Sequence, residues 1–256
     1  MKTSAPYSPP VAAPIVIFGA TSGSARALAR ELTRRGRDLV LVGRSEEALK
    51  AEAADLAVRV NRAVPVFAWD LLDRTHHAER FAALAAAHDI GGVFFAPGVL
   101  LSEAVAEADP ERTRHLFDLN LTEPVVVLNL FATHFNKRGG GFLSVLSSVA
   151  GDRGRAANKT YGASKAGLTA WLEGLRAALH GTGVLVQTVK SGPVRTPMTA
   201  AYKGPAILLA DPDAVAKTIV DAIEKKRTTV YAPGYWRYVM AVIRALPEFL
   251  ARKVPG

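Results

Sequence analysis

The sequence predicts a single doubly wound α/β domain, in which helices cover both faces of a parallel sheet of seven strands. Short apolar, β-branched runs alternate along the chain with longer stretches rich in Ala, Leu, Glu and Arg. Continuous apolar strands separated by amphipathic helices are typical of a parallel sheet buried on both faces. No repeat or internal linker interrupts this alternation, and 256 residues with 49% hydrophobic residues suffice for one large core.

The elements are expected in the order that the alternation gives. Each strand is a short apolar run, and the seven runs are residues 15–18, 39–42, 64–68, 92–96, 142–146, 184–189 and 228–231. The stretches between them carry helix-forming residues, and the clearest helices are expected at residues 25–35, 46–58 and 163–179. Residues 1–13 are polar and rich in proline, which predicts a disordered tail ahead of one domain at residues 14–256.

Composition excludes several classes of protein. The absence of cysteine excludes a disulfide framework, a thiolate zinc site and a cysteine nucleophile. The net charge of +9 is diffuse except near the C-terminus, and no helix-turn-helix or basic–aromatic pattern accompanies it, so we expect no nucleic-acid partner. No apolar run reaches the roughly 18 to 20 residues of a membrane span, and the start lacks the apolar core of a signal peptide. We therefore expect a cytoplasmic protein.

A glycine-containing turn follows the first expected strand and leads directly into a helix. Glycines at this point let the backbone approach a pyrophosphate, whose charge lies against the amides of the helix N-terminus. Small residues also suit an ordinary strand–helix connection, which is the alternative. At the first strand of this α/β pattern, the turn predicts a nucleotide site with contacts from Gly19, Thr21, Ser22, Gly23, Ser24 and Ala25.

The end of the second expected strand bears on the choice of nicotinamide cofactor. An acidic residue there would accept hydrogen bonds from the adenosine ribose and repel a 2′-phosphate, but this chain has Gly43, Arg44 and Ser45. A guanidinium beside a hydroxyl suits a phosphate dianion, so the sequence favours NADP(H), with NAD(H) and a solvated arginine as the alternative. Asp70, after the third strand, is placed to meet the adenine edge, or else to cap a helix.

Four residues further along form a candidate catalytic set. Tyr161 and Lys165 are four apart on an expected helix, so their side chains share one face. A phenol has a pKa of about 10, and a neighbouring ammonium is expected to lower it and make the phenol a usable acid–base. Ser148, at the end of the fifth strand, is placed to hold a substrate oxygen, and Asn120 to anchor a water in a proton relay. The alternatives are that Tyr161 and Lys165 form a chance pair, that Ser148 caps the turn after its strand, and that Asn120 lies on a solvated helix face.

Taken together, these residues resemble the short-chain dehydrogenases/reductases. The resemblance rests on the ordered set Gly19-x3-Gly23, Asp70, Asn120, Ser148, Tyr161-x3-Lys165 and the stretch SGPVRTPM at residues 191–198. It implies a Rossmann-type domain and hydride transfer between nicotinamide and a carbonyl or alcohol. It also implies the roles of the four side chains: Tyr161 is the acid–base, Lys165 binds the nicotinamide ribose and tunes Tyr161, Ser148 polarises the substrate, and Asn120 supports the relay.

The same resemblance extends the cofactor site and marks three departures. Further cofactor contacts are expected from Leu71, Ala96, Gly98, Gly192, Val194 and Thr196, with Thr196 near the nicotinamide carboxamide. Ala25 replaces the third glycine of the turn, Phe-Ala-Pro-Gly at residues 95–98 replaces Asn-Asn-Ala-Gly, and Ser191 replaces a proline. None of these departures touches the four catalytic side chains, so a working enzyme is expected.

Two stretches resemble a narrower subgroup, the reductase subunit of decaprenylphosphoryl-ribose 2′-epimerase. They are AGDRGRAANKTYGASKAGL and VYAPGYWRYVMAVIRALPEFLARKVP. The subgroup implies a keto-sugar on a polyprenyl phosphate as substrate, and Arg153 and Arg155 border the substrate side, where guanidiniums could pair with a phosphate. The alternative for both is a solvated arginine.

Two other functions stay open on the sequence alone. One is a general NADPH-dependent reductase of ketones, aldehydes or 3-oxoacyl thioesters. The other is a catalytically silent nucleotide-sensing protein, which would not require the intact Ser148, Tyr161 and Lys165. By analogy with related proteins we expect a homo-oligomer, a dimer or tetramer, that acts on a small carbonyl or alcohol substrate.

The C-terminal extension, residues 234–256, is expected to form an amphipathic helix. Between residues 235 and 250, apolar side chains recur at three- and four-residue steps: Trp236, Val239, Met240, Ile243 and Leu246. Cations lie around and beyond them, at Arg237, Arg244, Arg252 and Lys253, with Glu248 as the only acid. The helix is expected to contact a membrane surface or cover a lipid-like substrate. The alternative is a helix packed on its own domain or on a partner subunit.

Overall fold

The computed structural model describes residues 13–202 and 204–252. Within them, seven strands form one sheet in the order β3-β2-β1-β4-β5-β6-β7, and every neighbouring pair is parallel. The strands are β1 (Ile15–Phe18), β2 (Leu39–Gly43), β3 (Val66–Ala68), β4 (Gly92–Phe95), β5 (Gly141–Ser148), β6 (Val184–Ser191) and β7 (Thr229–Ala232). The predicted fold class is confirmed.

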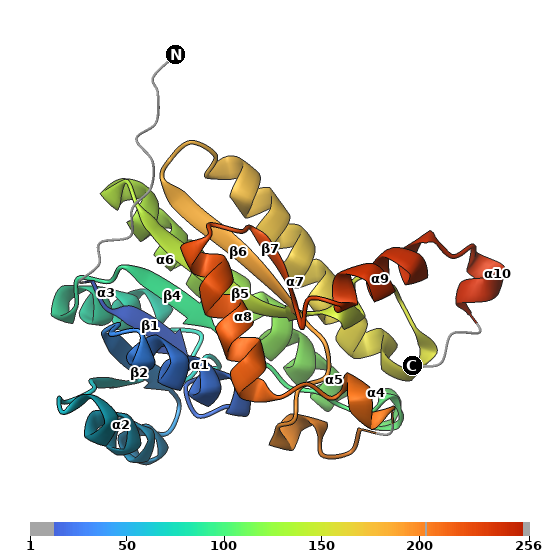
Figure 1. Ribbon diagram of the computed structural model, residues 1–256, viewed down its shortest axis with the longest axis horizontal. Helices are drawn as coiled ribbons and strands as arrows, with labels where there is room; N and C mark the ends of the chain where they lie inside the picture. Colours follow the sequence, from blue (N-terminus) through green and yellow to red (C-terminus); the bar gives the residue numbers. More distant parts are fainter. Residues whose placement is uncertain (1–12, 203, 253–256) are drawn as a thin grey trace.

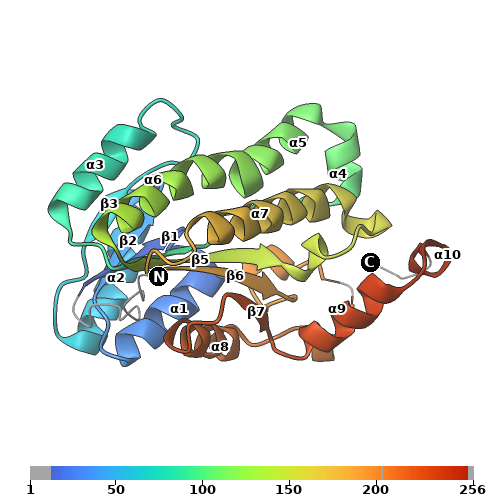
Figure 2. The ribbon, with the colours of Figure 1, turned by 90° about the horizontal axis from the view of Figure 1, so that it is seen from above.

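Helices cover the two faces of this sheet as separate layers, which Figure 2 shows edge-on. One face carries α1 (Gly23–Arg34), α2 (Glu46–Val60) and α8 (Pro212–Glu224), and the other carries α3 (His77–Ala87), α6 (Glu123–Arg138) and α7 (Lys159–Ala178). Side chains alternate between the faces along each strand, so Ile15 and Ile17 join one buried cluster and Val16 and Phe18 the other. Two apolar cores thus hold the sheet between its helices.

Several boundaries differ from those expected. The predicted tail at residues 1–12 lies outside the described residues, while Ala13, predicted as its last residue, is buried and packs against Gly91. β5 and β6 are longer than predicted and stay paired to their ends, which places Ser148 opposite Ser191. α7 begins four residues early, at Lys159, so Tyr161 lies in its first turn.

The C-terminal extension is not one helix. It forms α9 (Trp236–Ala245) and α10 (Glu248–Ala251), and Leu246 between them is extended. Pro247 causes the break, because proline disfavours helical backbone in the residue before it and cannot donate to the preceding turn. Trp236 and Met240 are buried against Val149, so the predicted apolar stripe packs on its own domain, as in the alternative above.

One helical stretch among the described residues, Pro110–Arg138, is long and apolar enough to cross a membrane by length and composition alone. It comprises α5 (Pro110–Phe117), a π-helical turn and α6. Its large apolar side chains, such as Phe131 and Phe135, are fully buried in the core beside the sheet. This stretch is therefore explained as a core segment of the domain.

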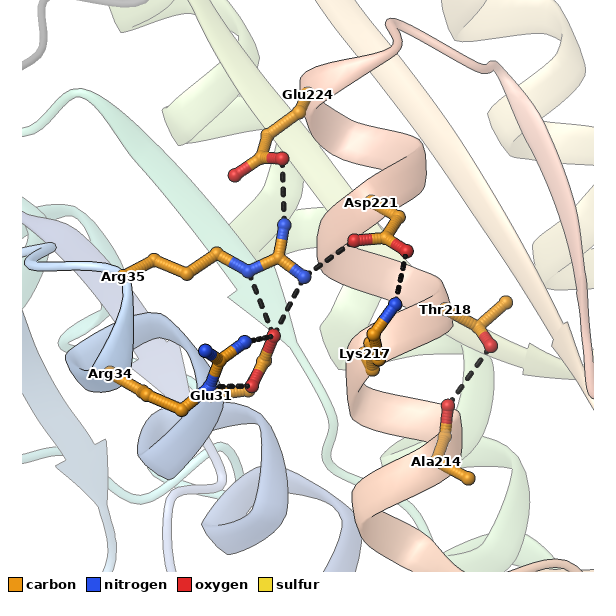
Figure 3. Close-up of polar contacts among 8 residues, drawn as sticks. All are labelled: Glu31, Arg34, Arg35, Ala214, Lys217, Thr218, Asp221 and Glu224. Carbon is orange, nitrogen blue, oxygen red and sulfur yellow. Dashed lines mark hydrogen bonds and ion pairs between the residues drawn. The ribbon is translucent and has the colours of Figure 1, made fainter.

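An ion-pair network joins α1 to α8 (Figure 3). The Arg35 side chain, only 16% exposed, places its guanidinium 2.6 Å from Glu31, 2.5 Å from Asp221 and 2.6 Å from Glu224. Hydrogen bonds from Arg34 and Arg35 lower the pKa of Glu31 from 4.5 to about 2. Arg35, with help from Lys217, lowers the pKa of Asp221 from 3.8 to about 2.

The network predicts an acid-sensitive fold. Because folding lowers both carboxyl pKa values, their stabilisation is present above pH 4.5 and is lost as pH falls toward about 2. The melting temperature should therefore fall steeply over this interval, and Arg35→Met should make the fall shallower, chiefly through Asp221. Calorimetry across these pH values measures the effect, with Arg112→Met as an exposed control. Equal slopes for wild type and Arg35→Met would contradict this explanation.

Candidate active site

The predicted catalytic residues meet at the carboxyl ends of β4, β5 and β6. Ser148 ends β5, where its hydroxyl accepts a hydrogen bond from the Ala150 amide at 3.1 Å and donates one to the Ser191 carbonyl at 3.4 Å. Ser148 therefore does cap the turn after β5, which was the alternative considered above. Its hydroxyl also lies within hydrogen-bonding reach of Tyr161. The capping bond leaves the Ser148 oxygen room for one more partner.

Lys165 lies beneath Tyr161 on the same face of α7. Its ammonium is 5.9 Å from the centre of the Tyr161 ring and donates to the Leu146 carbonyl at 3.2 Å. Only 4% of Lys165 is exposed, and this burial lowers its pKa to about 8. The lysine is therefore charged at neutral pH and loses its charge a little above it.

The pKa of Tyr161 differs from the expectation. Burial raises it above 10, and the hydrogen bond with Ser148 opposes that rise only in part. The net pKa is therefore raised and not lowered as expected, because desolvation of the phenolate is the largest contribution to the shift. Tyr161 therefore carries its proton at neutral pH.

Asn120 is fully buried, so the solvated helix position considered above is wrong. It sits in the π-helical turn Asp118–Thr122, a rare geometry that recurs at functional sites. Its amide accepts from the Val99 nitrogen at 2.8 Å and donates to the Val99 carbonyl at 2.9 Å and to Ser164 at 3.2 Å. Asn120 thus joins the loop after β4 to the helix that carries Tyr161.

Gly98 lies between Asn120 and Lys165. A Cβ atom at this position would be 2.9 Å from the Asn120 carbonyl oxygen and 3.3 Å from the Lys165 ammonium. Only glycine leaves this space free, so the loop after β4 passes close to both side chains. Ala96, two residues earlier, is buried and extends the pairing of β4 with β1 through a hydrogen bond to Phe18.

The glycine turn lies beside this cluster, at the end of β1. Gly19 adopts a φ of +76°, and a Cβ there would be 3.1 Å from Pro97 in the loop after β4. Ser22 caps α1 by accepting a hydrogen bond from the Ala25 amide at 3.4 Å, and no acidic residue occupies the first turn. Thr21 lies in the turn itself, and Ser24 lies in the first turn of α1. The helix end is thus ready for an anion.

The residues after β2 and β3 lie at the same edge of the sheet. Arg44 is exposed and makes no ion pair with the described residues, while Ser45 caps α2 by accepting from Ala48 at 3.3 Å. Asp70 is exposed and accepts from the Leu72 amide at 2.9 Å, which closes a turn, so the helix-cap alternative is wrong. Leu71 beside it is buried.

The loop after β6 contacts both the glycine turn and α9. A Cβ at Gly23 would be 2.8 Å from the Thr196 methyl group, and a Cβ at Gly192 would be 1.9 Å from the indole nitrogen of Trp236. Val194 is buried and forms an isolated bridge with Ala210. The expected cofactor segments are therefore in contact. Trp236 also lies against one of them, although the sequence predicted it only as part of the apolar stripe of the C-terminal helix.

The two arginines predicted on the substrate side differ. Arg153 donates to the Arg244 carbonyl at 3.2 Å and to the Glu248 carboxylate at 3.0 Å, so its guanidinium already has partners within the protein. Arg155 has a buried Nε with no hydrogen-bond partner among the described residues. Burial lowers its pKa, and Tyr202 nearby opposes this only weakly. Of the two, Arg155 is the one whose guanidinium makes no hydrogen bond or ion pair with the part of the chain that the structure describes.

Sequence reasoning missed a buried network under the loop between Ser148 and Tyr161. Lys190 of β6 lies 2.6 Å from Asp152, and the Tyr231 hydroxyl donates to the same carboxylate at 2.7 Å. Burial, together with the bond to Asp152, raises the pKa of Tyr231 to about 12. A lysine directly after a strand predicted to be buried, at residues 184–189, was the signal that could have indicated a partner.

Comparison with known proteins agrees with this arrangement. A family model described as short chain dehydrogenase matches residues 13–205. An uncharacterised oxidoreductase of Mycobacterium tuberculosis is 36% identical over 245 residues, which cover 95% of this chain and 98% of the relative.

Solved structures share the fold. The bulky-bulky ketone specific alcohol dehydrogenase from Comamonas testosteroni has a TM-score of 0.77 and 23% identity, over 93% of this chain and 96% of that one. A short-chain dehydrogenase from Sphingobium yanoikuyae in complex with NADPH has a TM-score of 0.75 and 24% identity, over 92% and 97%. The chain therefore belongs to the short-chain dehydrogenase/reductase family and is an oxidoreductase of that family.

Proposed function

We propose that this oxidoreductase uses NADP(H) to interconvert a carbonyl and a secondary alcohol, with a keto-sugar carried on a polyprenyl phosphate as its substrate. The observation that carries the proposal is the meeting of Ser148, Tyr161, Lys165 and Asn120 at one edge of the sheet. A proton donor, a hydroxyl within reach of it and a buried ammonium nearby are the groups that carbonyl reduction requires.

The residues present fit a dinucleotide. The acid-free N-terminus of α1 suits a pyrophosphate, and the positive φ of Gly19 lets the backbone turn tightly beneath it. The glycine turn, the loop after β4 and the loop after β6 contact one another through Pro97 and Thr196, so one extended ligand can reach all three. When bound, the nicotinamide supplies or accepts the hydride.

The protein supplies the proton and holds the substrate oxygen. Because burial keeps the Tyr161 phenol protonated, it is ready to give its proton to an oxygen that gains negative charge during reduction. The Ser148 hydroxyl holds the same oxygen, and the Lys165 ammonium stabilises the phenolate that remains. Asn120 fixes the loop after β4 beside Lys165, where a water can return the proton.

The proposed preference for NADP(H) predicts a switch in the variant Arg44→Asp. The wild type presents an exposed guanidinium beside Ser45 that makes no ion pair with the described residues, and Gly43 rather than an acid ends β2, which favours a 2′-phosphate. The variant replaces that cation with an acceptor for a ribose hydroxyl, so the ratio of kcat/KM for NADPH to that for NADH should fall. Competition between the two cofactors measures the ratio. A wild type that already prefers NADH would contradict the proposal.

The proposed substrate class rests on Arg155 and on the two stretches that resemble the epimerase reductases. An uncommitted guanidinium between the catalytic Ser148 and Tyr161 suits a phosphate on the substrate. The test compares initial rates with NADPH on a polyprenyl-phosphate keto-sugar, on simple diketones and on acetoacetyl thioesters. The proposal predicts the highest kcat/KM for the phosphorylated sugar. Faster turnover of the diketones or thioesters would instead support a general reductase.

A further inference from the structure

α9 and α10 carry apolar side chains on two faces, and only one of them is used by the fold. The inner face packs on the domain through Trp236 and Met240, with Val239 and Ile243 beside them. The other side leaves large apolar groups in solvent, with Tyr238 73%, Val242 64% and Phe249 58% exposed. We call this the outward face, and it consists of Tyr235, Tyr238, Val242, Phe249 and Leu250.

This exposure is concentrated at one end of the molecule. Among the described residues, the exposed large apolar side chains number ten, and five of them lie on the outward face. Figures 1 and 2 both show α9 and α10 extending beyond the sheet, away from the helical layers. Since scattered single apolar residues are normal and five on two consecutive short helices are not, the outward face marks an interaction surface.

The exposed charges on α9 and α10 are mainly positive. Arg237 and Arg244 are exposed on α9, and Arg252 is exposed directly after α10. The only acid on these two helices, Glu248, is paired with Arg153 at 3.0 Å. The partner must therefore accept apolar side chains and bring negative charge.

We propose that the outward face docks on the surface of an anionic lipid bilayer. Tyr238, Val242 and Phe249 would enter the boundary between headgroups and acyl chains, while the arginines pair with lipid phosphates. A second copy of the chain fits less well. Each copy carries a net charge of +9 and exposes Arg237 and Arg244 on this helix, so a second copy would not bring the negative charge that these cations call for.

The docked face would lie beside the mouth of the active site. Arg153, in the loop between Ser148 and Tyr161, donates to the Arg244 carbonyl of α9 and to Glu248 of α10. Trp236, at the start of α9, lies against Gly192 in the loop after β6. Docking would thus bring the site to the membrane surface. The inference deepens the proposed function, since a lipid-linked substrate would be met there, but it does not depend on the substrate's identity.

Sedimentation of the full-length protein with vesicles tests the proposal. The vesicles contain phosphatidylcholine alone or phosphatidylcholine mixed with phosphatidylglycerol. Wild type should sediment with the anionic vesicles only, and high salt should release it, because the arginine–phosphate attraction is screened. Arg237→Glu should weaken binding by at least roughly five-fold, the effect of removing one cation. The double variant Val242→Ser/Phe249→Ser should bind more weakly still.

Two matched controls separate the outward face from general properties of the surface. Val58, on α2, is 86% exposed, so Val58→Ser removes an equally accessible valine elsewhere. Arg112→Glu makes the same change in net charge as Arg237→Glu at an exposed site on α5. Both controls should sediment as wild type does. Circular dichroism and NADPH binding should confirm that every variant is folded.

Any of the following results would overturn the proposal. The first is equal weakening by Arg237→Glu and Arg112→Glu, which would mean that binding follows net charge alone. The second is unchanged sedimentation of the double variant, or no sedimentation of the wild type. The third is a smaller mass for the double variant in analytical ultracentrifugation without any vesicle binding by the wild type, which would make the face a contact between copies. None of these measurements involves turnover, so failure here is distinguishable from failure of the proposed reductase.

Discussion

Replacing Tyr161 with phenylalanine should lower kcat by about 10²- to 10⁴-fold, the usual contribution of a general acid–base. The variant keeps the ring that packs over Lys165 and removes only the hydroxyl that meets Ser148. Because that hydroxyl acts in proton transfer, the affinity for NADPH should stay close to that of wild type. Steady-state kinetics and a fluorescence titration with NADPH measure the two quantities separately.

The matched control for this prediction is Tyr238→Phe. It removes the same hydroxyl from an exposed tyrosine on α9 and should leave kcat unchanged. Wild-type kcat in Tyr161→Phe would show that another group supplies the proton. A loss of NADPH binding as large as the loss of kcat would show that the hydroxyl mainly supports the cofactor site.

Lys165→Met should lower both kcat and NADPH affinity, and it is the second large effect that we expect. The buried ammonium lies beside Tyr161, and it would be 3.3 Å from a Cβ atom at Gly98 in the loop after β4. The same charge is therefore close to the phenol and to a loop expected to contact the cofactor. The loss in kcat/KM should reach at least about 10²-fold, because an acid–base loses the charge that tunes it.

This lysine also predicts how NADPH affinity depends on pH. Its pKa is lowered to about 8, so the ammonium is present below that pH and is lost as pH rises through it. NADPH affinity of the wild type should therefore weaken across this value, whereas Lys165→Met should bind weakly at every pH. Equal affinity of the two proteins below pH 8 would contradict the role of the ammonium.

The sequence predicted the parts of the site that depend on chain order. Periodicity located the seven strands. Because the carboxyl ends of parallel strands lie at one edge of the sheet, Ser148 and the loops after β4 and β6 were expected to lie close together there. The four-residue spacing of Tyr161 and Lys165 put both on one face of α7.

Properties that depend on distant contacts could not be predicted in this way. Arg153 is held by groups 91 and 95 residues away, so spacing alone left it free for a phosphate. The direction of the Tyr161 pKa depends on how deeply the ring is buried, which only packing decides. The break at Pro247, by contrast, could have been predicted, because proline ends helices. The apolar periodicity of residues 235–250 suggested one continuous helix and drew attention away from this proline.

The most direct test of the central claim follows the hydride itself. NADPH deuterated at the transferring position of the nicotinamide is incubated with the protein and a panel of keto-sugars, ketones and 3-oxoacyl thioesters, and the products are analysed by mass spectrometry. The account predicts one deuterium on the carbinol carbon of a product in wild type and almost none in Tyr161→Phe. Tight NADPH binding by the wild type without deuterium in any product would contradict it and indicate a nucleotide-sensing protein.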